Sequence, residues 1–236
     1  MSQQMHINTW KFLFGGGILG LILSSILIMI ILYLVNSKLQ EQRKLSLRDQ
    51  HIEQVSRFGG IGLFWGFLGA LILLWWIPLE QQLIGLEFLP QNRLAGLCIG
   101  GMLAWGIGFA DDVIDLRARW KLAGQIVLSV LAIGLGFEIN VIQVPVLQNI
   151  NLGPWSWPIT ILWIVGVINA INLIDGLDGL ASGLVIIALA CFGILCLWQG
   201  QYSLLILIFV LVGVTLGFWL FNRPQASIFM GDSGSM

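Results

Sequence analysis

The chain has 236 residues, of which 58% are hydrophobic and only 10% are Asp, Glu, Lys or Arg. A soluble domain cannot bury so much apolar surface, so this composition excludes a soluble protein and indicates an integral membrane protein. The net charge of −1 gives no reason to expect nucleic acid as a partner. The three cysteines lie inside apolar runs and carry no functional signal.

The first apolar stretch, 12–35, is longer than the apolar region of a secretory signal peptide and is followed by no small-residue cleavage site. It therefore predicts a transmembrane helix. Further charge-free stretches of spanning length predict additional helices. Together these stretches predict an all-α polytopic membrane protein with about seven transmembrane helices, forming a single domain over residues 1–236. The remaining stretches are 59–78, 94–110, 121–137, 157–174, 180–198 and 203–221.

Basic residues gather on one side of this predicted topology. If the loop 36–58 is cytoplasmic, alternation places nine of the eleven basic residues on that side, and only Lys11 and Arg93 on the other. This positive-inside bias predicts that the loops carrying the acidic clusters described next are also cytoplasmic. The nine residues are Lys38, Arg43, Lys44, Arg48, Arg57, Arg117, Arg119, Lys121 and Arg223.

The third apolar stretch ends in an acidic cluster of Asp111, Asp112 and Asp115. On a helix, residues 111 and 115 would share a face, with 112 about 100° around the axis. Acids gain nothing from the macrodipole at a helix C-terminus, which favours cations. We interpret the cluster either as a solvated loop that stops translocation or as a cation site or catalytic base.

Polar side chains recur at every third residue where the fifth stretch ends, at Asn169, Asn172, Asp175 and Asp178. On a helix these positions would form one slowly rotating stripe. The glycines that follow allow close approach of a ligand or a break in the helix. A plain connection between two spans does not need this spacing, so the pattern favours a binding site.

Two further segments are ambiguous when each is taken alone. The loop Gly231-Asp232-Ser233-Gly234-Ser235 is either a turn or an anion nest in which Asp232 holds Mg²⁺. Arg57, at the start of the second stretch, either extends its charge to the membrane surface or binds phosphate.

In order and spacing, four segments of this chain resemble the signatures of the polyprenyl-phosphate N-acetylhexosamine-1-phosphate transferases. They are Arg57-x-Gly59-Gly60, Asp111-Asp112, the run from Asn169 to Leu180, and the run from Phe229 to Ser235. The resemblance implies a membrane enzyme with cytoplasmic active-site loops. The family has more helices than the seven predicted here, so the resemblance also implies a transferase domain that is incomplete at its C-terminus. This chain alone is then expected to have weak or no transferase activity.

The resemblance implies transfer of N-acetylglucosamine 1-phosphate, or another N-acetylhexosamine 1-phosphate, from a UDP-sugar to undecaprenyl phosphate. UMP would be released, and lipid-linked cell-wall or polysaccharide synthesis would begin. The implied cofactor is Mg²⁺, with Mn²⁺ as the alternative ion, and the implied location is the bacterial plasma membrane. The partners would be the UDP-N-acetyl sugar, undecaprenyl phosphate, membrane lipid and, in a homodimer, a second copy of the chain.

The same resemblance implies roles for individual residues. Asp111, Asp112 and Asp175 would be catalytic, and Asp232 and Asp175 would bind the metal. The substrate-binding residues would be Arg57, Asn172, Asp178, Asn222 and Phe229, with Phe229 stacking on uracil.

Three alternatives remain open from the sequence. A sibling phospho-N-acetylmuramoyl-pentapeptide transferase is disfavoured by Ser-Arg-Phe-Gly-Gly at 56–60, where that branch typically has Pro-Thr-Met-Gly-Gly. An ion-coupled transporter would carry its acids near span centres and would contain inverted repeats, whereas these acids lie at span ends. A polyprenyl pyrophosphate phosphatase would have no use for a uridine-binding signature.

Overall fold

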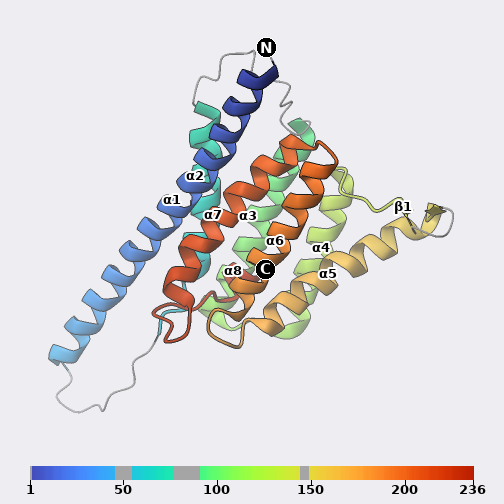
Figure 1. The fold of residues 1–236 in the computed structure, drawn as a ribbon. Coiled ribbons are helices and arrows are strands. Elements are labelled where there is room, and N and C mark those ends of the chain that lie inside the picture. Colours follow the sequence, from blue (N-terminus) through green and yellow to red (C-terminus); the bar gives the residue numbers. More distant parts are fainter. Residues whose placement is uncertain (1, 46–54, 77–90, 144–148) are drawn as a thin grey trace.

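The computed structural model describes residues 2–45, 55–76, 91–143 and 149–236 (Figure 1). Within these ranges the chain is almost entirely helical, with one short antiparallel pair of strands. The helices are α1 (Ser2–Leu45), α2 (Gly59–Trp76), α3 (Gln91–Ile114), α4 (Ala118–Gly134), α5 (Ser156–Ile174), α6 (Leu180–Trp198), α7 (Tyr202–Asn222) and α8 (Asp232–Ser235). Strands β1 (Val141–Ile142) and β2 (Ile150–Asn151) and the 3₁₀ turn η2 (Gly153–Trp155) connect α4 to α5.

The predicted all-α polytopic architecture is confirmed, and each of the seven apolar stretches corresponds to a helix. Within the described ranges, five helical segments are long and apolar enough to cross a bilayer. The apolar part of α2, Gly59–Leu74, is shorter, and α4 has only 17 residues. The end of the stretch 59–78 lies outside the described residues, as does Arg48. The five segments are Trp10–Ser37, Arg93–Ile114, Gly153–Ile174, Leu180–Trp198 and Tyr202–Asn222.

Helix α3 is longer than expected, because it continues through the acidic pair to Ile114. The carboxylate of Asp111 accepts a hydrogen bond from the Leu116 backbone N–H at 2.8 Å, which anchors the acid inside the last turn. Asp115 has a φ of 46° and terminates the helix in the left-handed region. The expectation that Asp115 shares a helical face with Asp111 is therefore wrong, and Asp115 is exposed.

Helix α4 ends at Gly134, earlier than the predicted boundary at 137. Gly136 has a φ of 93°, a conformation that a residue without a Cβ adopts at little cost. The Phe137 N–H bonds back to the Ala132 carbonyl at 3.0 Å, and the Gly136 N–H bonds to the Ile133 carbonyl at 2.9 Å. This is a Schellman motif, which satisfies carbonyls that the helix would otherwise leave unpaired.

Helix α7 is the central helix and packs against α1, α2 and α6. Small residues allow α1 and α7 to approach closely, since an added Cβ at Gly213 would overlap the carbonyl oxygen of Gly17. Close backbone approach of this kind is typical of membrane helices, whose association depends on packing. The surrounding apolar core contains Leu13, Ala70, Leu74, Leu205, Ile206, Val210 and Val214.

The segments with the acidic clusters meet at one end of the bundle, the lower end in Figure 1. There α3, α5 and α7 end, and α4, α6 and α8 begin. Helix α5 leans away from the other helices and packs mainly against α4. The alternating topology therefore brings residues that are far apart in sequence into one neighbourhood.

Candidate active site

An open pocket of about 440 Å³ lies at this end of the bundle. Eight of the nine residues proposed from the sequence line it, and the exception is Asp111, which is buried behind the pocket wall. The lining residues are Arg57, Asp112, Asn172, Leu173, Asp175, Gly176, Leu177, Asp178, Asn222, Phe229, Gly231 and Asp232.

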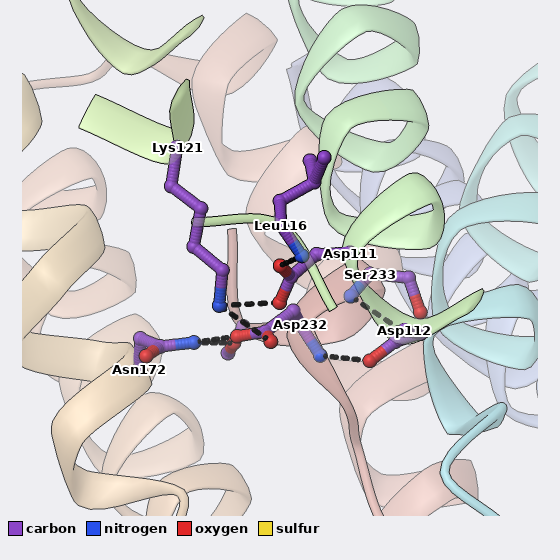
Figure 2. A network of polar contacts seen from close by, with 8 residues as sticks. Asp111, Asp112, Leu116, Lys121, Asn172, Asp232 and Ser233 are labelled. Atoms are coloured by element: carbon purple, nitrogen blue, oxygen red, sulfur yellow. Dashed lines mark hydrogen bonds and ion pairs between the residues drawn. The ribbon is translucent and has the colours of Figure 1, made fainter. Parts of the chain in front are cut away.

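Asp232 is held between two helices (Figure 2). Lys121 on α4 donates a hydrogen bond from Nζ to Oδ2 at 3.0 Å, and Asn172 on α5 donates from Nδ2 to Oδ1. Asn172 also donates to the Ser235 hydroxyl at 2.9 Å. Burial alone would raise the pKa of Asp232, but hydrogen bonds with Asp111, Lys121 and Asn172 outweigh it and lower the pKa. The carboxylate is therefore ionised and fixed in orientation.

Asp112 holds the backbone of the Asp232 loop. Its Oδ1 accepts the Asp232 N–H at 2.8 Å and its Oδ2 accepts the Ser233 N–H at 2.9 Å. Gly231 has a φ of 70°, and a Cβ there would lie 2.8 and 2.9 Å from the two Asp112 oxygens. Of the two alternatives that the sequence left open for this loop, the structure has successive N–H groups around an anion, and that anion is the Asp112 carboxylate.

Lys121 is a site residue that the sequence reasoning counted only as a cytoplasmic charge. Its ammonium group forms ion pairs with Asp111 and Asp232 (Figure 2). A lysine in the first turn of α4 and an aspartate in the last turn of α3 both oppose their helix dipoles. Each is therefore unfavourable alone, and their pairing offsets the cost. A cation at a helix N-terminus was the signal in the sequence that could have revealed this contact.

Asp175 directly follows the last residue of α5 and is half-buried in the pocket wall. In the described part of the chain, its carboxylate forms no hydrogen bond or ion pair. Burial raises its pKa to about 7, and the nearby carboxylates of Asp232 and Asp112 add to the rise. The Asp175 carboxyl group therefore exchanges its proton near neutral pH.

The stripe of polar residues does not continue as one helix. Helix α5 ends at Ile174, and Gly179 adopts a φ of 71° in the turn that leads into α6. Asp178 therefore lies in the turn, where its Oδ2 accepts the Ala226 N–H at 3.1 Å. Asp178 still lines the pocket, so the end of α5 at Ile174 changes the direction of this side chain but leaves it in the site.

Asn222, the last residue of α7, is buried and links three segments. Its Oδ1 accepts hydrogen bonds from the Gly179 N–H at 3.2 Å and the Ser182 hydroxyl at 2.9 Å. Its Nδ2 donates to the Ile228 carbonyl at 3.0 Å. The side chain thereby fixes the α5–α6 turn against the segment that leads to Asp232.

The Arg57 and Phe229 segments pair through their backbones. The Phe229 N–H donates to the Ser56 carbonyl at 2.8 Å, and the Gly59 N–H donates to the Phe229 carbonyl at 3.0 Å. A Cβ at Gly59 would lie 2.5 Å from that carbonyl oxygen, so only glycine permits this approach. The pairing brings Arg57 and the partly exposed Phe229 ring to the same pocket.

The described residues contain no group of three or more His, Cys, Asp or Glu side chains arranged as a ready metal centre. Mg²⁺ does not require one, because it is usually held by one or two carboxylates together with water and substrate phosphates. Asp232 and Asp175 offer hard oxygen ligands in the same pocket, and no described residue forms a hydrogen bond or ion pair with the Asp175 carboxylate. The donor chemistry therefore fits Mg²⁺.

Comparison with known proteins gives a consistent result. Residues 94–236 match the model of a family described as Glycosyl transferase family 4. The chain is 32% identical to the probable undecaprenyl-phosphate N-acetylglucosaminyl 1-phosphate transferase of Bacillus subtilis, over 81% of this chain and 50% of that protein. It is 36% identical to the decaprenyl-phosphate N-acetylglucosaminephosphotransferase of Mycobacterium tuberculosis, over 80% of this chain and 48% of that protein.

A phospho-N-acetylmuramoyl-pentapeptide-transferase of Levilactobacillus brevis is similar over a shorter region. It is 40% identical over 95 residues, which cover 40% of this chain and 29% of that protein. The chain spans about half the length of the N-acetylglucosaminyl-type relatives.

Proposed function

The chain belongs to glycosyl transferase family 4, and we propose that it carries the reaction centre of a sugar-1-phosphate transferase. The donor is a UDP-N-acetylhexosamine, the acceptor is undecaprenyl phosphate, and UMP is the leaving product. The observation that carries this proposal is the convergence of Asp112, Asn172, Asp175, Asp178 and Asp232 on one open pocket at the end of the helices.

The chemistry requires two phosphate-bearing molecules to meet at a membrane surface. A lipid phosphate oxygen attacks the phosphorus that carries the sugar, a new P–O bond forms, and the pyrophosphate bond breaks to release UMP. A phosphate monoester has a second pKa near 6, so the attacking group is already mostly ionised at neutral pH. Proton removal then contributes little, and direct attack is simpler than a covalent aspartyl intermediate.

The main task of the site is to overcome repulsion between the phosphates. We assign Asp232 and Asp175 as the residues that hold Mg²⁺, which would neutralise phosphate charge when bound. Lys121 adds a fixed positive charge beside them, held by Asp111. Asp112 acts by holding the backbone of the Asp232 loop.

The donor nucleotide is proposed to occupy the part of the pocket between Phe229 and the α5–α6 turn. The partly exposed Phe229 ring offers a flat surface for uracil. Asn172, Asp178 and Asn222 line the nearby wall, and Arg57 is placed to meet a phosphate.

N-acetylglucosamine is the proposed sugar. The wider alignments are with relatives whose names specify N-acetylglucosaminyl phosphate transfer, whereas the pentapeptide-transferase alignment covers 40% of the chain. The positive-inside bias supports a cytoplasmic position for the pocket in a bacterial plasma membrane, where the water-soluble nucleotide is available.

A panel of UDP-sugars tests this proposal on the complete gene product in membranes, with undecaprenyl phosphate and Mg²⁺. We expect UMP release with UDP-N-acetylglucosamine and little with UDP-glucose or UDP-N-acetylmuramoyl-pentapeptide. Preference for the pentapeptide donor would reassign the substrate. Absence of UMP with every donor would reject the transferase function.

A further inference from the structure

We propose that Gln125 and Asn169 form a positioning clamp, one helical turn away from the pocket, that sets the spacing of Lys121 and Asn172 around Asp232. Asn169 on α5 donates a hydrogen bond from Nδ2 to Oε1 of Gln125 on α4 at 2.6 Å. This inference rests on the proposed function for its catalytic consequence. Neither residue is required by the reaction itself.

The two helices run in opposite directions, so their polar residues form successive rungs. The outer rung consists of Lys121 and Asn172, which each bond to a different oxygen of Asp232. Gln125 follows Lys121 by four residues and Asn169 precedes Asn172 by three, which places the second rung about 4.5 to 6 Å deeper. The carboxylate of Asp232 bridges α4 and α5 at the outer rung, and the two amides bridge them directly at the inner one.

The Gln125 side chain is only 3% exposed, whereas Asn169 is exposed on α5. The Asn169 Nδ2 also donates to the Val165 carbonyl at 2.8 Å. Because the Gln125 side chain is buried, water does not compete strongly for its Oε1, so the amide pair holds the two helices at a defined separation.

This clamp matters because α4 is the main packing partner of α5 among the described residues. The Leu162, Trp163 and Leu173 side chains along α5 are exposed. A small shift of α5 would move Asn172 away from Asp232 while Lys121 stayed in place. Displacement of a catalytic group by about 1 Å can cost on the order of 100-fold in rate, so a remote clamp can control turnover.

The test uses the complete gene product and four matched changes. Gln125→Leu and Asn169→Leu remove the bond while keeping similar volume. The exchange of both residues, Gln125→Asn with Asn169→Gln, keeps the combined reach of the pair. Thr160→Val is the structural control, because it removes a polar contact between α5 and the segment that follows α4. This contact is the 3.0 Å bond from the Ile139 N–H to the Thr160 hydroxyl, far from the pocket.

The first readout does not depend on activity. Acetylation of Lys121 by a small N-hydroxysuccinimide ester is measured by mass spectrometry on metal-free protein, with exposed Lys11 as the internal reference. We expect faster labelling of Lys121 in both leucine variants, because Asp232 then loses its Asn172 partner and holds the Lys121 ammonium group less firmly. The exchanged pair and Thr160→Val should label at the wild-type rate.

The second readout is UMP release. The leucine variants should lower kcat roughly tenfold or more, and the exchanged pair should recover most of the loss. The leucine variants and the Thr160→Val control are compared at equal thermal stability. If the leucine variants labelled Lys121 at the rate of the control, or had the kcat of the control in an active enzyme, the clamp would be rejected. If the wild type released no UMP, the proposed function would fail, while the labelling would still decide whether the clamp exists.

Discussion

The two sides of this helix bundle are held together by different chemistry. On one side, α1, α2 and α7 pack through apolar and small side chains, and the carbonyl of Gly17 lies against Gly213. Ser24 is fully buried there, and its hydroxyl has no hydrogen-bond partner among the described residues. On the other side, α3, α4, α5 and α8 meet through Asp112, Lys121 and their polar partners.

The difference indicates that the two sides of the bundle have different roles. Close packing of apolar side chains stabilises the fold, whereas charged hydrogen bonds have preferred directions and therefore hold the site residues in position. Substitutions on the packed side should therefore lower stability and leave turnover per folded molecule intact. Substitutions on the polar side should lower turnover more than stability. The following predictions test this separation.

The largest effect is expected for Asp232→Asn. The change keeps the shape of the side chain but removes the charge that faces both Lys121 and the proposed Mg²⁺. We expect kcat to fall about 100- to 1,000-fold, with a weaker dependence on Mg²⁺, measured by UMP release across a metal titration. Asp115→Asn, an exposed acid outside the pocket, is the control. Unchanged metal dependence in Asp232→Asn would remove this residue from the metal site.

Lys121→Met should have the next largest effect. Methionine has a similar length but leaves the buried Asp111 without its ion-pair partner. We expect kcat to fall about 100-fold, and the added change Asp111→Asn to recover part of it, because an unpaired buried charge is then also removed. Arg119→Met, which alters an exposed arginine over the Trp120 ring, is the control. An equal loss of kcat in Lys121→Met and Arg119→Met would show that turnover depends on positive charge in general and not on the Lys121 ion pairs.

A smaller effect is expected from pH acting through Asp175. Its pKa is raised to about 7, so the carboxyl group is mostly protonated below that pH and must lose its proton to bind a cation. Mg²⁺ affinity should therefore rise about tenfold between pH 6 and pH 8, measured by calorimetry on the substrate-free protein. Asp175→Asn should abolish this dependence. If the Mg²⁺ affinity of Asp175→Asn still rose with pH, the titrating group would be a residue other than Asp175.

The smallest effect on turnover is expected for Gly213→Ala, on the packed side. The new methyl group would overlap the Gly17 carbonyl and force α1 and α7 apart. The melting temperature should fall clearly, while UMP release per folded molecule stays near the wild-type value. Gly15→Ala is the matched control, because a Cβ there meets no atom of the described residues within 4 Å. Selective loss of turnover without loss of stability would contradict the proposed division.

Much of this arrangement was predictable because membrane helices and short motifs leave strong signals. Hydropathy alone located the seven long helices of the described ranges, since the bilayer sets their length. Motif spacing located the pocket residues, although Asp111 faces Lys121 behind the wall and Asp115 turns away in a left-handed conformation. These side-chain directions depend on where each helix terminates, and hydropathy does not report that.

The contacts that join distant segments were not predictable in the same way. From the sequence, Lys121 was interpreted only as a cytoplasmic positive charge. Gln125, inside an apolar stretch, was not predicted to have a role. The function of each depends on a partner from another helix, Asp232 for Lys121 and Asn169 for Gln125. Periodicity within one helix contains no information about which neighbour faces it.

The most direct test of the central claim follows the phosphate that carries the sugar. UDP-N-acetylglucosamine labelled in the β-phosphate is incubated with the complete gene product, undecaprenyl phosphate and Mg²⁺, alongside Asp232→Asn. We predict that the label moves into the lipid fraction in equal amount to the UMP released, and that the variant largely abolishes both. Label that remained on the uridine nucleotide as UDP, or equal transfer by the variant, would contradict the account.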